Sequence, residues 1–490
     1  MSRSSPCSCD ASDKRRVGQG TTSSITLTVL QGSTRSEAAR PSRGDHPMRS
    51  HSIPQLHQTT RCLLFGTALL SVCPAMAQQA TTDGWLGQPT MTGDWGGLRT
   101  ELQNDGITLR AHWTTESAGN PSGGKYQTAR YTQQFDLGAD FDLDRLWGVP
   151  DAKIQFTLTD RSGRSLSADA IGNQFAVQEL YGAGQNFRLA ELNYQQDLLD
   201  HKVIIELGWS PLGDHFANLP AFCDFQNGVI CGHANAMTVN SGAHNFPTAE
   251  WGARIEVRPT PGFYVATGIY QVNPNEGNAD EGFNLSFKST GAFIPVELGW
   301  MTGSGSGELP GNIKVGGYYN TSKAPDVLTD VNGLSAGLTD GSFEQHNGRS
   351  GGYVVANHMV YREGPDSACG LYFGAMAGVG DAATAKFRYF WMAGGHFQGT
   401  FPGRDDDVVA FMVAYARTNS RLTRYQEDRD SVTPGAVGIQ TYESVAEIDY
   451  GARLTPWLVL RPNLQYVIHP GGTGKIPDAF VIGLYTQVTF

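Results

Sequence analysis

Apolar and polar residues alternate with a period of two in many segments of the chain. In the segment 107–116, Ile107, Leu109, Ala111 and Trp113 share one face, and threonine, arginine, histidine and glutamate occupy the positions between them. Such alternation is typical of a β-strand that has one apolar and one polar face. Each of these segments is about ten residues long, which is the length that a tilted strand needs to cross a bilayer.

The pattern recurs from residue 107 to the end of the chain. It is clear at 130–141 and at 250–258, and in the last segment, 480–490, which ends on Phe490. A soluble sandwich would bury the apolar faces in a core, whereas a membrane barrel turns them towards lipid and encloses the polar faces. The alternation therefore predicts an all-β protein and leaves both architectures open.

The lengths of the links between strands favour the membrane barrel. We count about sixteen strands, with links of about 2 to 10 residues after the even-numbered strands and mostly about 12 to 38 after the odd-numbered ones. Short periplasmic turns and long external loops produce this asymmetry, so we predict a transmembrane antiparallel β-barrel of the outer-membrane porin type with both termini on the periplasmic side. The predicted strands begin near Ile107, Arg130, Ala152, Phe187, Lys202, Ala249, Gly262, Ala292, Gly311, Gly352, Cys369, Lys386, Asp407, Thr441, Trp457 and Phe480.

Composition and motifs exclude several other classes of function. The net charge of -11 argues against nucleic-acid binding, because phosphate backbones attract basic surfaces. No Cys or His spacing fits a structural zinc site, and the sequence contains neither a phosphate-binding loop nor a nucleophile elbow. We therefore expect no enzyme activity, no metal, no cofactor and no nucleic-acid partner.

The amino-terminal region has the features of a secretion signal. Arg61 precedes an apolar stretch at 62–72, and Ala-Met-Ala ending at Ala77 forms a small-residue cleavage site. The predicted divisions of the chain are a non-native or disordered extension at 1–47, a signal peptide at 48–77, a short periplasmic segment at 78–106 and the barrel at 107–490. Secretion places the protein in an oxidising compartment, where Cys223 and Cys231 are expected to form a disulfide.

Several motifs resemble the carbohydrate-selective porin family of OprB-like glucose porins. The run 93–99, Gly-Asp-Trp-Gly-Gly-Leu-Arg, looks like the opening motif of that family, and the run 403–407, Gly-Arg-Asp-Asp-Asp, is similar to an element of a periplasmic turn. The most distinctive match is the closing part, 443–472, which contains Leu-Thr-Pro-Trp-Leu and His-Pro-Gly-Gly. The resemblance implies a barrel of about sixteen strands and passive uptake of monosaccharides. The segment that contains Cys223 and Cys231 also looks like a loop feature of the family.

The polar faces of the predicted strands supply the candidate binding residues. Both signs of charge are interleaved, which suits neutral polyhydroxyl solutes because guanidinium and carboxylate groups can each hydrogen-bond hydroxyls. Arg254, Glu256 and Arg258 are the best candidates for a constriction, since they are consecutive inward positions on one strand. The predicted lumen residues are Arg110, His112, Glu116, Arg130, Gln134, Arg254, Glu256, Arg258, Lys314, Glu443, Glu447, Arg461, Asn463 and Gln465.

Two long external segments, 161–186 and 211–248, are candidates for a loop that folds into the lumen. We favour the second as a partial plug or an external lid. Its aromatic residues Phe216, Phe222 and Phe225 could stack on sugar faces or pack the loop onto itself.

We therefore expect an outer-membrane porin for passive, carbohydrate-selective diffusion of small, glucose-like sugars into the periplasm of a Gram-negative cell. Its expected partners are small neutral sugars, the lipid bilayer with its lipopolysaccharide, and the barrel-assembly machinery, and the number of subunits stays open. Two alternatives remain: a structural or adhesive barrel with a closed lumen, and a porin for another solute class such as organic acids.

Overall fold

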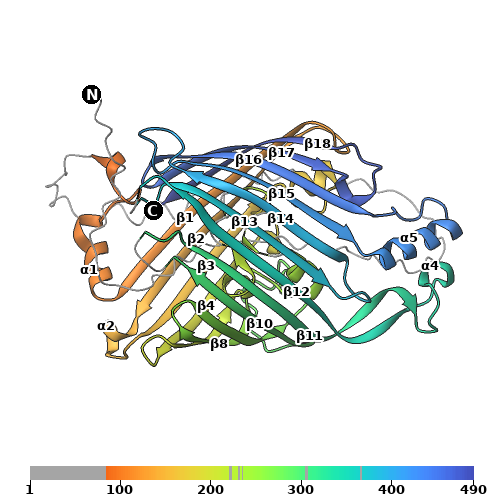
Figure 1. The fold of residues 1–490 in the computed structure, drawn as a ribbon, viewed down its shortest axis with the longest axis horizontal. Helices are drawn as coiled ribbons and strands as arrows, with labels where there is room; N and C mark the ends of the chain where they lie inside the picture. The colour runs from red at the N-terminus through yellow and green to blue at the C-terminus, as the bar shows by residue number, and fades with distance from the viewer. Residues whose placement is uncertain are drawn as a thin grey trace, which may run out of the picture. The chain divides into compact units, whose positions relative to one another are not determined.

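The computed structural model describes residues 84–219, 223, 225–229, 232–233, 235–303, 307–364 and 367–490. The predicted extension at 1–47 and the predicted signal peptide at 48–77 lie outside the described residues. Sixteen strands form one closed antiparallel barrel, in which β1 (Ile107–Ser122) pairs with β18 (Ala479–Thr489) (Figure 1). The predicted all-β porin barrel is confirmed.

All sixteen predicted strands are present in the barrel. Their first residues agree with the prediction to within one residue, except for β12, which begins nine residues earlier, at Phe343 instead of Gly352. The strands between β1 and β18 are β2 (Ala129–Asp142), β3 (Ala152–Gly163), β4 (Phe187–Leu198), β5 (Val203–Ser210), β8 (Glu250–Thr260), β9 (Phe263–Val272), β10 (Gly291–Thr302), β11 (Gly311–Asp330), β12 (Phe343–Arg362), β13 (Gly370–Gly380), β14 (Phe387–Gln398), β15 (Val408–Thr418), β16 (Tyr442–Thr455) and β17 (Leu458–Ile468).

The early start of β12 reflects a hairpin that continues beyond the rest of the barrel wall. β11 and β12 are each 20 residues long and stay paired as far as Asp330 and Phe343. Residues 344–349 are polar or glycine, so this part of β12 lacks the apolar alternation by which we recognised the other strands.

The outward faces of the strands carry the apolar belt that the alternation predicts. Phe135, Ile255 and Ile482 keep 41, 40 and 52% of their surface exposed, whereas the inward Glu256 keeps only 4%. So many large exposed apolar side chains are incompatible with water and require lipid around the barrel. The polar faces therefore enclose the interior.

Two external loops fold into the barrel. We call residues 164–186 the first inner loop and the described residues of 211–249 the second inner loop. Phe175 of the first loop and Phe216 and Phe225 of the second are almost completely buried in one apolar cluster with wall residues such as Phe390. The second loop also contains the small hairpin β6 (Asn218–Leu219) and β7 (Gly232–His233) and the helix α3 (Asn235–Ser241), which contacts β11 to β14.

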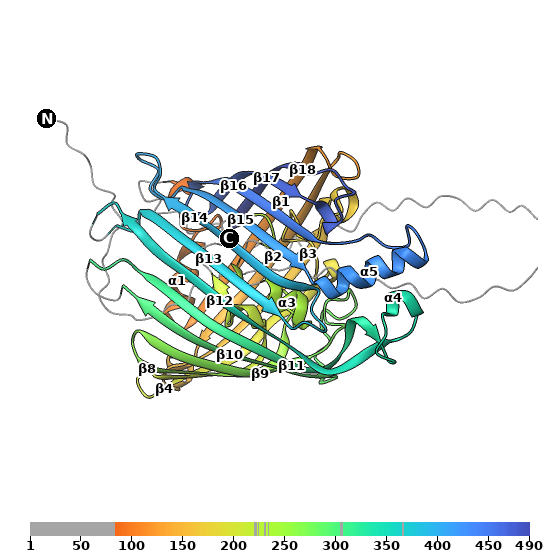
Figure 2. The ribbon, with the colours of Figure 1, turned by 45° about the vertical axis from the view of Figure 1, so that its right-hand side comes forward.

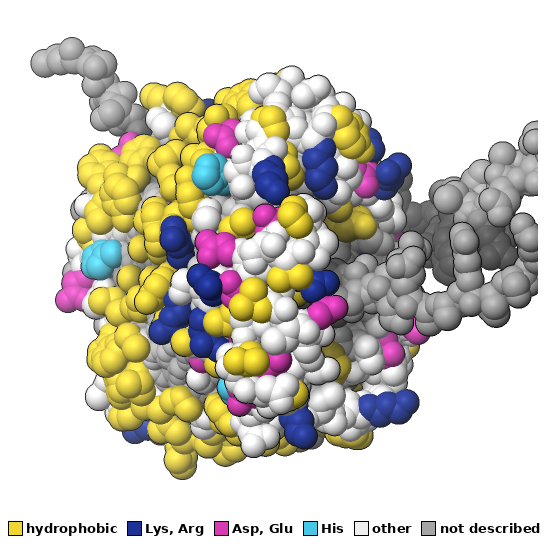
Figure 3. All heavy atoms as spheres, turned by 90° about the vertical axis from the view of Figure 1, so that its right-hand side faces the viewer, with side chains coloured by type: hydrophobic (Ala, Val, Ile, Leu, Met, Phe, Trp, Pro, Cys, Tyr) yellow, Lys and Arg dark blue, Asp and Glu magenta, His cyan; other side chains and the backbone are white. Residues whose placement is uncertain are grey.

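Two helices that the sequence analysis did not predict lie on the long external links. α4 (Ala336–Thr339) contacts α5 (Ser420–Val432), and Figure 2 shows the pair next to the protruding end of β11. Arg421 of α5 forms an ion pair of 2.7 Å with Asp326. The signal for α5 was present, because Asn419 caps the helix and Pro434 follows it. Basic and acidic side chains are interspersed on the face at this end of the molecule (Figure 3).

The segment before β1 packs against the opposite end of the barrel. It contains α1 (Leu98–Asn104), whose last carbonyls accept hydrogen bonds from Arg145 of α2 (Leu143–Trp147). The backbone N–H of Met91 donates to the carbonyl of Thr489, and the rings of Trp85 and Trp457 lie 4.6 Å apart. Among the described residues, no helix combines the length and the apolarity needed to cross a membrane.

The lipid-facing belt predicts that the stability of the barrel depends on an apolar side chain at Val296. This residue lies in the middle of β10, and 48% of its surface is exposed. Val296→Arg places a charge in hydrocarbon and should lower the free energy of unfolding in lipid vesicles by about 2–4 kcal/mol. Val296→Leu is the matched control and should leave it nearly unchanged. Urea titration of the refolded barrel measures both, and equal stability of the two variants would contradict the lipid-facing assignment.

Candidate functional site: the barrel interior

A wall carboxylate on β16 helps to hold the first inner loop inside the barrel. Glu443, on the inward face of β16, accepts hydrogen bonds of 2.8 Å from the backbone N–H groups of Gln174 and Phe175. It also accepts one of 2.7 Å from the backbone of Gly471, which belongs to the link between β17 and β18. The Glu443 side chain is completely buried, so these amides satisfy a charge that has no access to water.

Several wall residues hold the second inner loop. Glu447, also on β16, accepts hydrogen bonds from the backbone N–H groups of Gln226 at 2.8 Å and Asn227 at 2.9 Å. Glu297 of β10 accepts one of 2.8 Å from the backbone of Ala217, and Lys314 of β11 donates to the Asn218 carbonyl at 3.0 Å. Several points along the loop are thus fixed to the wall.

Glu297 is itself fixed by two tyrosines. The phenol groups of Tyr264 and Tyr353 donate to its two carboxylate oxygens at 2.7 and 2.9 Å. The ring of Tyr264 lies over Gly299, where a Cβ atom would come within 2.0 Å of the ring. Glycine at this position of β10 is therefore what allows the tyrosine to reach the carboxylate.

Seven of the predicted lumen residues form hydrogen bonds with the inner loops. Besides Glu443, Glu447 and Lys314, they are Arg130, Asn463, Gln465 and Glu116, which accepts from the backbone of Leu180 at 3.1 Å. The Gln465 amide donates to the carbonyl of Val177 at 3.0 Å and accepts from Asn227 at the same distance. The sequence analysis placed these residues on the inward face, but it could not identify the loop atoms that they bind.

The predicted constriction residues of β8 lie together on the inward face. Glu256 pairs with Arg254 and, at 2.6 Å, with Arg258. The Arg254 guanidinium also lies 5.9 Å from the ring centre of Phe216, so the second inner loop covers this part of the β8 ladder, the name we give to Arg254, Glu256 and Arg258. Phe216 and Phe225 are buried by packing and offer no free ring face, and Phe222 lies outside the described residues.

The remaining predicted lumen residues are dispersed around the interior. Arg110 pairs with Asp140 at 2.9 Å, and the Arg461 guanidinium lies 4.7 Å from the ring centre of Tyr485. Arg130 pairs at 2.5 Å with Asp169, which belongs to the first inner loop. The structure does not bring these three arginines into one cluster with the β8 ladder.

The sequence analysis missed Arg161, which it assigned to a loop. The residue belongs to β3, faces inward and is 1% exposed. Its Nε donates to Gln134 at 2.6 Å, and Gln134 donates to Asp136 at 2.7 Å. Its two terminal nitrogens have no hydrogen-bond partner among the described residues, and neither do one oxygen of Glu116 and one of Asp136. Buried donors and acceptors of this kind indicate a place for water or solute.

The disulfide between Cys223 and Cys231 stays a prediction, because Cys231 lies outside the described residues. Asp326, Glu344 and His346 approach one another closely enough to suggest a metal site. Arg421 already neutralises Asp326, however, and His346 lies 2.9 Å from the same carboxylate.

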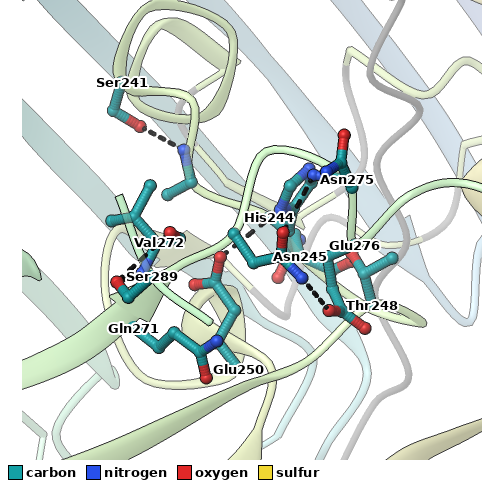
Figure 4. Close-up of polar contacts among 12 residues, drawn as sticks. Ser241, His244, Asn245, Thr248, Glu250, Gln271, Val272, Asn275, Glu276 and Ser289 are labelled. Carbon is teal, nitrogen blue, oxygen red and sulfur yellow. Dashed lines mark hydrogen bonds and ion pairs between the residues drawn. The ribbon is translucent and has the colours of Figure 1, made fainter. Parts of the chain in front are cut away.

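A buried titratable cluster lies where the second inner loop meets the rim loop, which we define as residues 273–290. His244 Nδ1 lies 3.3 Å from a carboxylate oxygen of Glu250, and Glu276 accepts a hydrogen bond of 3.0 Å from Asn273 (Figure 4). All of these side chains are buried. The cluster thus joins an inward-folded loop to one that crosses the ends of β4 and β8.

A closed barrel with an apolar outer belt, a charged interior and loops folded inside it defines an outer-membrane channel protein. The family model for the carbohydrate-selective porin, OprB family, matches residues 126–490. The chain belongs to this family and is an outer-membrane porin.

Relatives with names and structures agree with this assignment. Porin B of Pseudomonas aeruginosa is 36% identical over 82% of this chain and 91% of its own length, and a putative porin, QuiX, of Acinetobacter baylyi is 29% identical over 82% and 93%. The high-pH structure of Pseudomonas putida OprB covers 82% of this chain and 99% of that chain, with 36% identity and a TM-score of 0.79. The low-pH structure of the same protein gives 27% identity and a TM-score of 0.53 over the same shares.

The rim-loop cluster predicts that the stability of the folded rim loop depends on pH. Burial raises the pKa of Glu276 to about 8, with Glu250 and Glu281 adding to the effect and Arg188 opposing it. The folded loop therefore binds this proton more tightly than the unfolded chain, and its stability should fall as pH rises from the ordinary glutamate range through about 8.

Limited proteolysis within 273–290 at pH 5.5 and pH 8.5 measures this dependence. We expect faster cleavage at the higher pH in the wild type, and a smaller difference in Glu276→Gln. Asp280→Asn is the matched control from the same loop, because Asp280 is exposed and is not one of the groups that shift the pKa of Glu276, and it should retain the wild-type difference. An unchanged difference in Glu276→Gln would show that another group is responsible.

Proposed function

We propose that this porin admits small neutral sugars of the glucose type through a subsite formed by Arg161, Glu116 and Asp136. The supporting observation is the set of unpartnered buried atoms: two guanidinium nitrogens and two carboxylate oxygens, counted among the described residues. The register supports their proximity. Gln134 of β2 pairs with Arg161 of β3 and, on its other side, with Thr114 of β1. Glu116 is the next inward residue after Thr114 on β1.

A sugar hydroxyl suits this set because it can accept and donate at the same time. It would accept from the guanidinium and donate to a carboxylate, so that neighbouring hydroxyls satisfy both charges. The lost hydration of the sugar is replaced without a net charge on the solute. The inward ladder of Arg254, Glu256 and Arg258 would offer a second region with the same mixed chemistry.

The charges around Arg161 favour neutral solutes over anions. Glu179, Asp136 and Glu116 all interact electrostatically with its guanidinium. An organic acid that approached the guanidinium would meet these carboxylates, and like charges in a poorly hydrated interior repel strongly. This balance favours sugars over the alternative class of organic acids.

The remaining expectations about this chain stay predictions. They include roles in solute contact for Arg110, Arg130 and Arg461, cleavage of a signal peptide at 48–77, contact with lipopolysaccharide and insertion by the barrel-assembly machinery. The family consists of channels, and we propose no enzymatic activity.

Replacement of Arg161 tests the subsite. In planar bilayers, glucose should reduce the current through the wild-type channel, and Arg161→Gln should weaken this effect by about tenfold or more because a charged donor is lost. The more negative interior should also shift the ion preference towards cations. Arg164→Gln is the matched control, because Arg164 is 68% exposed and pairs with Asp169 in the first inner loop.

Other outcomes would favour the alternatives. No stepwise current at all would indicate a closed structural or adhesive barrel. Liposome swelling that is faster with gluconate than with glucose would favour a porin for organic acids. An equal response of the wild type and Arg161→Gln to glucose would remove the subsite from the proposal.

A further inference from the structure

We infer that Glu443 and Glu447 are positioning residues that set the size limit of the channel, because one strand fixes the inward ends of both inner loops. Both carboxylates lie on the inward face of β16, and their surfaces are 0% and 1% exposed. Glu443 binds the first inner loop and Glu447 binds the second. The inference rests on the proposed function only for the identity of the solute.

The strand order explains why these contacts control the bore. The second inner loop connects β5 to β8, and β16 lies eight strands from β8 in either direction around the barrel. Glu447 is therefore on the wall opposite the start of β8. The loop must cross the interior to reach Glu447, so its pinned position decides how much of the interior stays open.

The two loop amides that bind Glu447 require a carboxylate at this position. Each oxygen of Glu447 accepts from one of two consecutive amides, Gln226 to Oε1 and Asn227 to Oε2. Consecutive backbone N–H groups that converge in this way form an anion-binding concavity. An amide side chain of the same size would point an NH₂ group at one of these donors, which leaves a buried N–H without an acceptor.

Neighbouring wall contacts fix the same loop segment from β17. Asn463 donates to the side chain of Gln226 at 2.8 Å, and Gln465 accepts from Asn227 at 3.0 Å. These bonds use side chains of the loop, whereas Glu447 uses its backbone. The two kinds of contact can therefore be separated by substitution on the loop.

The experiment measures the bore with neutral polyethylene glycols of graded size in planar bilayers, which report the size limit whatever solute the channel prefers. We expect Glu447→Gln and Glu443→Gln to admit larger polymers, and the ratio of trisaccharide to monosaccharide swelling rates to rise about fivefold or more. Hydrogen exchange at residues 226–227 should accelerate in Glu447→Gln, and that at 174–175 in Glu443→Gln. Glu191→Gln is the matched control, because Glu191 is buried on the inward face of β4 and bonds the wall side chains of Thr157 and Asn193.

A pair of loop variants covers the case in which a wall substitution prevents assembly. Gln226→Ala and Gln226→Pro both remove the Gln226 side chain. Only the proline also removes the backbone N–H that donates a hydrogen bond to Glu447. We expect a larger bore in Gln226→Pro than in Gln226→Ala. An unchanged polymer limit in Glu447→Gln with accelerated exchange at 226–227, or equal limits in the two loop variants, would overturn the inference. If only the glucose response is lost, in Arg161→Gln, the inference about Glu443 and Glu447 is unaffected.

Discussion

Hydrocarbon offers peptide groups no hydrogen-bond partner, and this constraint shapes the whole protein. Every strand must pair on both edges, so β1 closes against β18 and no free edge remains. Closure in turn forces each strand to present one face to lipid and the other to the interior. The alternation of apolar and polar residues follows directly from that division, and the charged groups that would be costly in lipid are collected inside.

The same requirement operates again within the interior. Loops that enter a confined space carry backbone N–H groups away from bulk water, and these groups need acceptors. The wall supplies them as carboxylates: Glu443 and Glu447 from β16, and Glu297 from β10. Buried carboxylates and buried loop amides are each unfavourable alone and satisfy each other when the loops are folded inward.

Not every charge of the interior is used in this way. Arg161 keeps two nitrogens without a partner among the described residues, although its third guanidinium nitrogen is fixed by Gln134. A rigidly held group with unused hydrogen-bonding capacity is what a channel needs in order to replace the hydration of a passing solute. The interior thus contains hydrogen-bonding groups that the loops occupy and others that no described residue occupies.

The sequence by itself determined the barrel, because a period of two, a strand length and an alternation of link lengths are local properties. It identified the inward faces that carry Glu443 and Arg254, for the same reason. Only the tertiary structure decided which of these residues bind loops, since Glu447 meets Gln226 across 221 positions of the chain. The start of β12 at 344–349 and the wall position of Arg161 were likewise not visible, because polar residues occupy both faces there: Asp160 and Ser162 flank Arg161, and residues 344–349 are polar or glycine.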